Sequence, residues 1–466
     1  MTTLTLDLGT SATKGALWDG VELAAITRSP IATSHPEPGR AEQDPDAWWA
    51  SVVDVCAQLR RADGARYDAI DAVGFAAARE TFALFDASLA AVSAGILWSD
   101  RRAADQVAGL GDGAEFRART GVVLSPGCCR AKVRWTMEHE PAAWRAARWL
   151  LSPRDLVIAR TTGKVVTDET LASRTGCYDL DGDLLEHDAE VLLPPVVTAT
   201  TVLQAAAGAR DLGLRDGVSV IVGAGDRACE VLGVGATTHT PMVSWGTTAN
   251  VSVPEHGPAA AFPTVAQVSR GALGGFLVEA GLSAAGAAIA WLARLTGREH
   301  DDLLHTAAAV APGAGGVVAL PWLAGARAPW WEAGAHAAFL GLTEAHSAPE
   351  LARAVVEGVA YDVARCLELV APEAAELALA GGGAADASWR EVVAGVTGCS
   401  VVRRAIDDAA SVGARLLVAV ALGEVLPLDD VNPVVAREAP DRALVDAYAS
   451  LRETADALAS AVIDVQ

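Results

Sequence analysis

The residues that can do chemistry begin with a carboxylate that precedes a turn rich in glycine and hydroxyl side chains. Asp7 is followed by Gly9, Thr10 and Ser11, with Lys14 shortly after. A glycine lets the backbone approach a phosphate closely, the amides and hydroxyls of such a turn can donate to phosphate oxygens, and the lysine adds charge. Asp7 could hold a magnesium ion through water. Taken alone, the segment is about equally compatible with an ordinary N-terminal hairpin whose polar residues are solvated.

Two later segments place charged and aromatic side chains at the ends of apolar runs. Arg79 and Glu80 follow one such run, and Trp98 and Asp100 follow the next. Arginine and glutamate of fixed geometry, together with a tryptophan face, suit recognition of a small polyhydroxylated ligand. Each pair also has a simpler interpretation, as a surface ion pair or an interface tryptophan.

A further carboxylate lies between a strand and a helix near the middle of the chain. Val218–Val222 predicts a buried strand, which leads through two glycines to Asp226 and Arg227. Asp226 is therefore either the N-cap of the next helix or a catalytic carboxylate. Arg227 can contact an acidic or larger sugar, or keep Asp226 ionised.

The second half of the chain opens with a short repeat of the strand-turn-strand pattern at the start of the first. Met242–Trp245 and Asn250–Val253 read as strands on either side of Gly246, Thr247 and Thr248. Two lobes that each open with a hydroxyl-rich hairpin are what an ATP clamp would show.

A glycine-rich turn follows another strand further along. Glu376–Ala380 predicts the strand, and Gly381, Gly382, Gly383 and Ala384 separate it from a helix. Three glycines here let a ligand lie against bare backbone, and the N-terminus of the helix attracts negative charge.

The elements that must position these residues alternate between strands and helices in both halves, which predicts an α/β fold. Several helix starts are legible. Asp44 precedes Pro45, Ser347 and Glu350 form a capping box, and the helix after the triple glycine is expected to be capped by Asp386 or Ser388. We also expect a helix capped by Ser283 that runs to about Thr296, a helix over 407–422, and a loop over a pocket at 167–176.

Composition narrows the class of protein. The chain has 466 residues, enough for about two or three domains. The net charge of -22 argues against a nucleic-acid backbone as partner. We expect neither a membrane partner nor a signal segment, since no apolar run spans a bilayer. The seven cysteines show no metal spacing, which suggests free thiols in a cytoplasmic enzyme.

Several common site motifs are absent from the sequence. There is no G-x-x-x-x-G-K-[ST] loop, no G-x-G-x-x-G after a strand, no H-E-x-x-H and no G-x-S-x-G. The sequence therefore gives no support to a P-loop ATPase, a dinucleotide-dependent dehydrogenase, a zinc enzyme or a serine hydrolase.

Taken together, the motifs resemble those of the FGGY carbohydrate kinases over nearly the whole chain. Residues 6–11 are similar to the first phosphate motif of that family, and 225–226 with 232–233 to its catalytic-aspartate segment. Residues 245–248 are similar to its second phosphate motif, and 381–384 to its adenosine motif. Each motif is weak alone, but four in the right order are specific.

The resemblance implies two ribonuclease-H-like lobes of the actin/hexokinase type with a cleft between them. It divides the chain into 1–238 and 239–466, and implies ATP and Mg²⁺, with Asp226 as general base and Asp7 and Asp226 near the metal. A homodimer is expected at the level of the family. Nucleotide contacts fall to Gly9, Thr10, Ser11 and Lys14 in the first half, and to Gly246, Thr247, Thr248, Gly382, Gly383 and Ala384 in the second.

The implied substrate is a small sugar or polyol, bound by Arg79, Glu80, Trp98, Asp100, Asp226 and Arg227. Within the family the chain looks most like xylulokinases, whereas Arg79-Glu80-Thr81 resembles the pocket of glycerol kinases. A ketopentose such as xylulose is thus the leading substrate, and glycerol or another polyol the second. A non-catalytic regulator that binds sugar or nucleotide on this fold is the alternative class. The presence of both Asp7 and Asp226 favours the enzyme.

Overall fold

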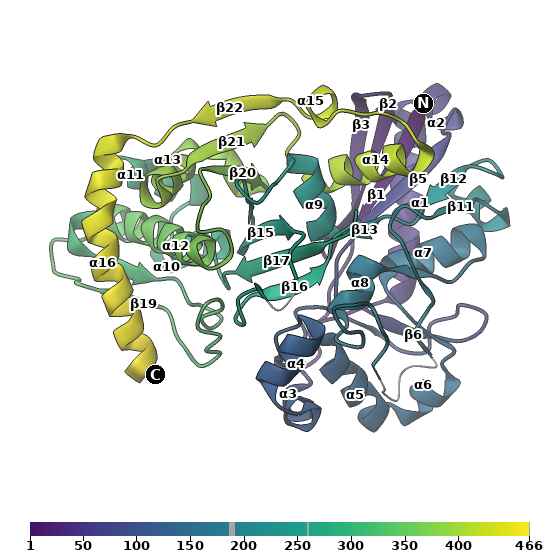
Figure 1. Ribbon diagram of the computed structural model, residues 1–466, viewed down its shortest axis with the longest axis horizontal. Helices are drawn as coiled ribbons and strands as arrows, with labels where there is room; N and C mark the ends of the chain where they lie inside the picture. Colours follow the sequence, from purple (N-terminus) through teal and green to yellow (C-terminus); the bar gives the residue numbers. More distant parts are fainter. Residues whose placement is uncertain (186–191, 259–260, 466) are drawn as a thin grey trace. The chain divides into compact units, whose positions relative to one another are not determined.

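The computed structural model describes residues 1–185, 192–258 and 261–465. The chain forms two compact units, each built from several segments (Figure 1). Unit 1 comprises Met1–Gly233, His256–Leu277 and Ala409–Asn432, and unit 2 comprises Val234–Glu255, Val278–Asp408 and Pro433–Gln466.

Unit 1 is organised around a mixed sheet whose strands follow the order β11-β12-β5-β1-β2-β3, with β13 paired to β5. β1 is antiparallel to β2 and parallel to β5, so the opening hairpin predicted from alternating leucines is confirmed. The strands are β1 (Thr2–Leu8), β2 (Ala12–Asp19), β3 (Glu22–Pro30), β5 (Ala72–Ala77), β11 (Val202–Gln204), β12 (Ser219–Ile221) and β13 (Ala224–Gly225).

Helices cover both faces of this sheet because side chains of β5 alternate between them. Val73 and Phe75 belong to the core that includes α1 (Pro45–Ala62) and α7 (Pro153–Thr162). Ala76 instead packs against α14 (Ala409–Leu422), which lies beside β1 and β5 in Figure 1. A segment from far along the chain therefore completes unit 1.

The rest of unit 1 holds short elements that carry the loops described below. The helices are α2 (Gly64–Asp68), α3 (Ala104–Val107), α4 (Gly113–Thr120), α5 (Cys129–His139), α6 (Pro141–Ala146), α8 (Glu169–Arg174), α9 (Asp226–Val234) and α15 (Leu428–Val431). The strands are β4 (Glu42–Gln43), β6 (Ala83–Phe85), β7 (Gly95–Ile96), β8 (Trp149–Leu151), β9 (Thr167–Asp168), β10 (Val196–Val197) and β16 (Gln267–Arg270).

Unit 2 repeats the same sheet plan, with strands in the order β17-β15-β14-β20-β21-β22. β14 is antiparallel to β15 and parallel to β20, just as β1 is to β2 and β5. The strands are β14 (Met242–Trp245), β15 (Ala249–Glu255), β17 (Phe276–Gly281), β20 (Glu376–Ala380), β21 (Ser400–Arg404) and β22 (Val434–Glu438), with β18 (Val318–Leu320) and β19 (Ala338–Leu340) in a separate pair.

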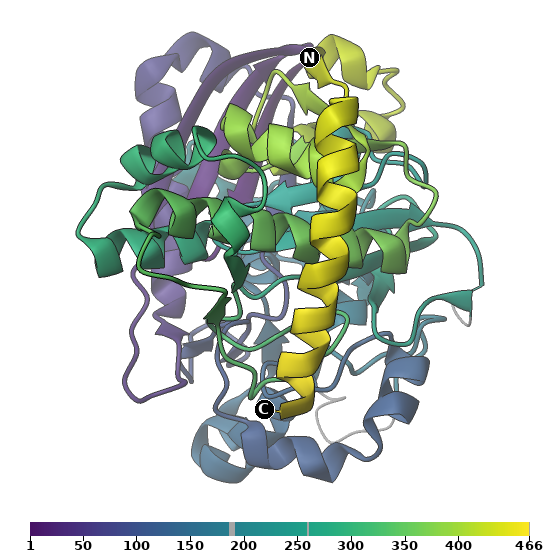
Figure 2. The same ribbon diagram turned by 90° about the vertical axis from the view of Figure 1, so that its left-hand side faces the viewer.

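The central helix of unit 2 is α12 (Ala348–Val370), whose start shows the predicted capping box of Ser347 and Glu350. α16 (Arg442–Val465) packs against α12 and α13 and ends with the C-terminus of the chain (Figure 2). The remaining helices are α10 (Gly286–Thr296), α11 (His300–Ala308) and α13 (Ala387–Thr397). None of the helices formed by the described residues combines the length and apolar character that a bilayer crossing requires.

Two local predictions are wrong, and both fail at helix starts. Residues 167–176 do border a cavity, but they are not a loop, because the Asp168 carboxylate accepts from the amides of Thr170 and Leu171 and starts α8. Ser283 does not cap α10, which begins after Ala285, because its hydroxyl donates to the Gly325 carbonyl. At the other uncertain start, Asp386 is the N-cap of α13. All seven cysteines are free, as expected, and all of them are buried.

Candidate active site

The candidate residues of unit 1 meet at the carboxyl ends of three adjacent parallel strands. β5 lies between β1 and β13, and Asp7 is in register with Ala76, which is in register with Ala224. Since neighbouring parallel strands end at one edge, Asp7, Arg79 and Asp226 are brought to the same side of the sheet. The Arg79 Nε lies 3.3 Å from the Asp226 Oδ1.

Asp226 is the first residue of α9, and its carboxylate is one-third exposed (33%). It accepts a hydrogen bond from the Arg227 amide at 2.7 Å. The Arg227 guanidinium turns instead to Glu230, with the Nη1 2.6 Å from Oε2. Arg79 therefore lies against the Asp226 carboxylate, which is still partly open to solvent.

The first turn touches the segment that carries Trp98. The Trp98 indole, 40% exposed, donates from Nε1 to the Thr10 Oγ1 at 2.9 Å. The Gln43 side chain donates to the Thr10 carbonyl at 2.6 Å, and Lys14 pairs across the hairpin with Asp7 at 3.5 Å. An aromatic face thus lies beside the hydroxyl-rich turn.

Asp100 differs from the other candidates because its carboxylate is completely buried. It accepts from the Ala41 amide at 2.7 Å and from the Arg102 guanidinium at 2.8 Å. Burial raises the pKa of Asp100, but the hydrogen bonds from Arg102 and Ala41 outweigh it and hold that pKa below its usual value. In this structure Asp100 orders the loop that follows Trp98.

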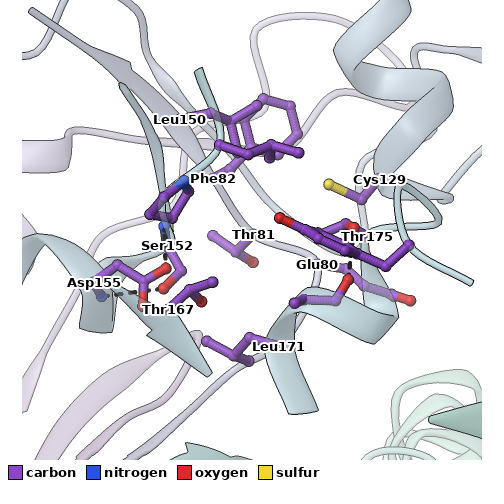
Figure 3. A pocket seen from close by; sticks show the side chains of 14 residues that line it. Glu80, Thr81, Phe82, Cys129, Leu150, Ser152, Asp155, Thr167, Leu171 and Thr175 are labelled. Atoms are coloured by element: carbon purple, nitrogen blue, oxygen red, sulfur yellow. Dashed lines mark hydrogen bonds between the residues drawn. The ribbon is translucent and has the colours of Figure 1, made fainter. Parts of the chain in front are cut away.

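Glu80 adopts a backbone conformation that is uncommon for a residue with a side chain, at φ 61°. Its carboxylate forms an ion pair with the buried guanidinium of Arg174. A cavity of about 40 Å³ lies against it (Figure 3). The cavity is lined by Glu80, Thr81, Phe82, Cys129, Leu150, Ser152, Asp155, Thr167, Leu171, Ala172, Thr175, Tyr178, Leu193 and Pro194.

In unit 2 the two glycine-containing turns also lie at adjacent strand ends. Ser244 of β14 is in register with Ala380 of β20. The pocket at this edge has a volume of about 610 Å³. It is lined by Trp245, Gly246, Thr247, Gly286, Ala287, Ala290, His300, Asp301, Leu304, Gly382, Gly383, Ala385, Asp386 and Trp389.

Two of the predicted nucleotide residues in unit 2 hold the turns without lining this pocket. The Thr248 carbonyl accepts from the Gly246 amide at 2.9 Å. Ala384 is buried, and its carbonyl accepts from the Arg390 guanidinium at 2.9 Å. The structure therefore gathers Gly246, Thr247, Gly382 and Gly383 around one hollow.

Comparison with known proteins identifies the family. The profile of the FGGY carbohydrate kinase N-terminal domain matches residues 2–233, and that of the C-terminal domain matches residues 237–422. The chain belongs to the FGGY family of carbohydrate kinases. It is therefore a kinase that phosphorylates a sugar or polyol with ATP.

Relatives of this FGGY kinase include enzymes with different named substrates. It is 31% identical to the xylulose kinase of Klebsiella pneumoniae, with 96% of each chain covered. It is 30% identical to the glycerol kinase of Trichlorobacter lovleyi, with 90% of each covered. The solved structure of xylulose kinase from Rhodospirillum rubrum matches at a TM-score of 0.90, with 27% identity, 100% of this chain and 99% of that one covered. The predicted α/β fold of two ribonuclease-H-like lobes is thereby confirmed, and the sheets of both are mixed.

The sequence did not mark every residue around these FGGY strand ends. His300 and Asp301 line the unit 2 pocket from the first turn of α11, and Trp389 packs edge-on against Trp245 with ring centroids 4.8 Å apart. Nothing in the spacing of His300 or Asp301 singled them out. The indole of Trp389 was detectable, since it lies in the first turn of the helix capped by Asp386.

The described residues of this FGGY kinase contain no group of three or more His, Cys, Asp or Glu side chains that could hold a metal by themselves. The strand ends of unit 1 supply two carboxylates, Asp7 and Asp226, and the Thr10 hydroxyl. Magnesium takes one or two carboxylates from the protein and completes its shell with water and substrate phosphates. The donor set fits magnesium held jointly with a nucleotide.

Proposed function

We propose that this FGGY kinase transfers the γ-phosphate of ATP to a hydroxyl group of xylulose or a closely similar ketopentose. The observation that carries the transfer is the solvent-open Asp226 carboxylate against Arg79, at the same sheet edge as Asp7. The choice of sugar rests on the xylulose kinase relatives, which match along almost the whole chain.

In this proposal Asp226 accepts the proton of the attacking hydroxyl. Phosphoryl transfer depends mainly on positioning and on neutralising charge. Arg79 and Glu80 hold the other hydroxyl groups of the sugar, the exposed face of Trp98 covers its carbon skeleton, and Asp100 orders the loop behind Trp98. In this proposal Arg227 lies at the outer edge of the bound acceptor.

The nucleotide is assigned to the glycine-containing turns. Adenosine lies against the backbone of Gly382 and Gly383 in the unit 2 pocket, and Ala384 holds the turn that presents them. Bound with the nucleotide, magnesium would neutralise charge on the phosphate oxygens, with Asp7 and Asp226 as its protein partners. The phosphate groups are held by Gly9, Thr10, Ser11 and Lys14 and by Gly246, Thr247 and Thr248.

The functional division that we propose follows the sequence, with acceptor binding and catalysis in 1–238 and adenosine binding in 239–466. Dimerisation and a cytoplasmic location stay predictions from the sequence.

A glycerol or polyol kinase is the second candidate. It is favoured by the glutamate at position 80 beside Arg79, and by the glycerol kinase relatives at about the same identity as the xylulose kinases. A non-catalytic binding protein on the same fold is the outcome that would remain if no acceptor were phosphorylated.

The test is ADP release by the purified protein with magnesium and ATP across ketopentoses, glycerol, other polyols and sugar acids. The Asp226→Asn variant should lose about 10²–10⁴-fold in kcat on the responding acceptor, which is the usual contribution of a general base. Asp216→Asn removes an exposed carboxylate of unit 1 that pairs with Arg210, and is the matched control. Full turnover by Asp226→Asn would contradict the assigned role, and no response to any acceptor would contradict the proposed substrate class.

A further inference from the structure

Glu80 is held in a conformation that its own backbone disfavours. A residue with a side chain in the left-handed region costs about 1–3 kcal/mol, and such a state persists only where the surroundings determine it. Glu80 has φ 61°, and it follows β5 at the sheet edge where Arg79 meets Asp226. The groups that impose this conformation are therefore candidates for a role in recognition.

The first of these groups is Lys132 of α5, which is fully buried. Its Nζ donates to the backbone carbonyl of Glu80 at 2.9 Å and to that of Leu97 at 2.8 Å. Leu97 directly precedes Trp98. One ammonium group thus connects the two segments that carry the proposed sugar contacts. Burial lowers the pKa of Lys132 against the opposing effect of nearby Glu80 and Asp100, so this ammonium is costly to keep in place.

The second group is Arg174, at the end of α8 and only 2% exposed. Its Nη2 donates to the Glu80 carboxylate and, at 2.7 Å, to the Gln267 Oε1. Its Nε and Nη1 are buried with no hydrogen-bond partner among the described residues. A guanidinium that leaves two donors unsatisfied is expensive to bury, and the ion pair with Glu80 is what offsets that cost.

Packing does not fix the Glu80 carboxylate. It borders the cavity of about 40 Å³, with Thr81 and Thr175 among the neighbouring side chains in Figure 3. A space of that volume can hold a few waters, so the carboxylate has room to leave its position. Its orientation therefore depends on the bond to Arg174.

We propose that Lys132 and Arg174 act as a clamp on Glu80, Lys132 on its carbonyl and Arg174 on its carboxylate, and that this clamp sets the affinity for the acceptor. Both are positioning residues, because their hydrogen bonds go to Glu80, Leu97 and Gln267. The inference rests on the proposed function, in which Glu80 holds a hydroxyl of the sugar. The inference adds that two buried residues, Lys132 and Arg174, determine how Glu80 is presented to the acceptor.

The experiment measures steady-state kinetics of the full-length protein on the acceptor that responds best. Arg174→Gln should raise the KM for the acceptor about tenfold or more, the loss of about 1.4 kcal/mol of binding free energy. It should leave the KM for ATP unchanged. Arg174→Lys keeps the buried charge but not the planar fork, so it should fall between wild type and Arg174→Gln. Lys132→Met should raise the same acceptor KM.

The interaction with Glu80 is tested by a double-mutant cycle. If Arg174 acts through Glu80, adding Arg174→Gln to Glu80→Gln should raise the acceptor KM no further. Arg415→Gln is the matched control, because Arg415 is buried in the same unit and donates to the Gly20 carbonyl and the Glu424 carboxylate. It should lower thermal stability without changing the acceptor KM.

Three outcomes would overturn the inference, and they are distinguishable. An unchanged acceptor KM in Arg174→Gln and Arg174→Lys, beside an active wild type, refutes the clamp alone. So do effects of Arg174→Gln and Glu80→Gln that simply add. Should Arg174→Gln fail to fold, Arg174→Lys and its cycle with Glu80→Gln decide the matter. A wild type that phosphorylates no acceptor refutes the proposed function and the clamp with it.

Discussion

The two units share the same sheet topology, but different kinds of residue lie at the ends of their strands. In each, an antiparallel hairpin is followed by a parallel strand, β1-β2 with β5 in unit 1 and β14-β15 with β20 in unit 2. Unit 1 places charged side chains there, as in the pair of Arg79 and Asp226. Unit 2 presents glycine backbone and indole rings around a hollow. The same geometry can therefore serve a ligand recognised through hydroxyl groups and one recognised mainly by a flat face.

One group of buried charges from each unit extends the comparison. In unit 1, Lys132 and Arg174 hydrogen-bond to Glu80. In unit 2, the buried Arg353 and Glu357 of α12 bond to each other and to Tyr448 of α16. Among the described residues that line the unit 2 pocket, none belongs to this group. The buried charges at Lys132 and Arg174 thus adjoin the candidate acceptor site, whereas those at Arg353 and Glu357 join two helices.

The largest effect expected from this comparison is that of substituting a glycine of the unit 2 turn. A Cβ at Gly383 would lie 2.3 Å from the Trp245 Cδ1, so Gly383→Ala must displace that indole. Overpacking of this kind costs about 1–3 kcal/mol. We expect a lower melting temperature and a KM for ATP raised about tenfold, which corresponds to about 1.4 kcal/mol.

Gly382→Ala is the control, because a Cβ there would meet no protein atom within 4 Å. Its melting temperature should equal that of wild type, and any rise in the KM for ATP would then report a ligand lying against the bare backbone. Equal melting temperatures for both variants would show that the indole contact does not constrain the turn.

A smaller effect tests the junction between the indole and the hydroxyl-rich turn in unit 1. Trp98→Phe keeps an aromatic face but loses the 2.9 Å bond to the Thr10 hydroxyl. A hydrogen bond of this kind contributes about 1 kcal/mol, so the acceptor KM should rise about fivefold. Trp149→Phe, whose parent ring contacts Arg148, should leave kinetics unchanged. If the acceptor KM of Trp98→Phe equals that of wild type, the hydrogen bond from the Trp98 indole to Thr10 does not contribute to acceptor binding.

The sequence revealed the strand ends because their signals are local. Alternating leucines, glycine-containing turns and capping residues marked β1, the turn after β14 and the start of α13. The clamp could not be found in this way, since Lys132 and Arg174 lie 52 and 94 residues from Glu80 along the chain. Only the fold brings such positions together.

Adjacency in sequence did not decide the contacts of one residue. Arg227 follows Asp226, and the sequence left two roles open for it, contact with an acidic or larger sugar and keeping Asp226 ionised. Successive residues on a helix point about 100° apart, so the Arg227 side chain reaches Glu230 three positions on instead. Arg79, from another strand end, takes the place beside Asp226. The counter-ion of a carboxylate at a strand end can come from a neighbouring strand, and the residue spacing within one segment does not reveal it.

The smallest predicted effect concerns pH and the buried charge of unit 2. Burial is the main cause that raises the pKa of Glu357 above its ordinary 4.5, outweighing the hydrogen bond from Arg353. Because the pKa is higher in the folded than in the unfolded state, the stabilising contribution of Glu357 is complete below 4.5 and is lost as pH rises through the folded value. The melting temperature of wild type should therefore fall relative to that of Glu357→Gln between pH 4 and pH 7.

The KM for ATP should be the same in wild type and in Glu357→Gln, since Glu357 does not line the pocket. A difference in melting temperature that is constant with pH would mean that the pKa of Glu357 is the same in the folded and the unfolded state. A changed KM for ATP would mean that this buried charge also supports the site in unit 2.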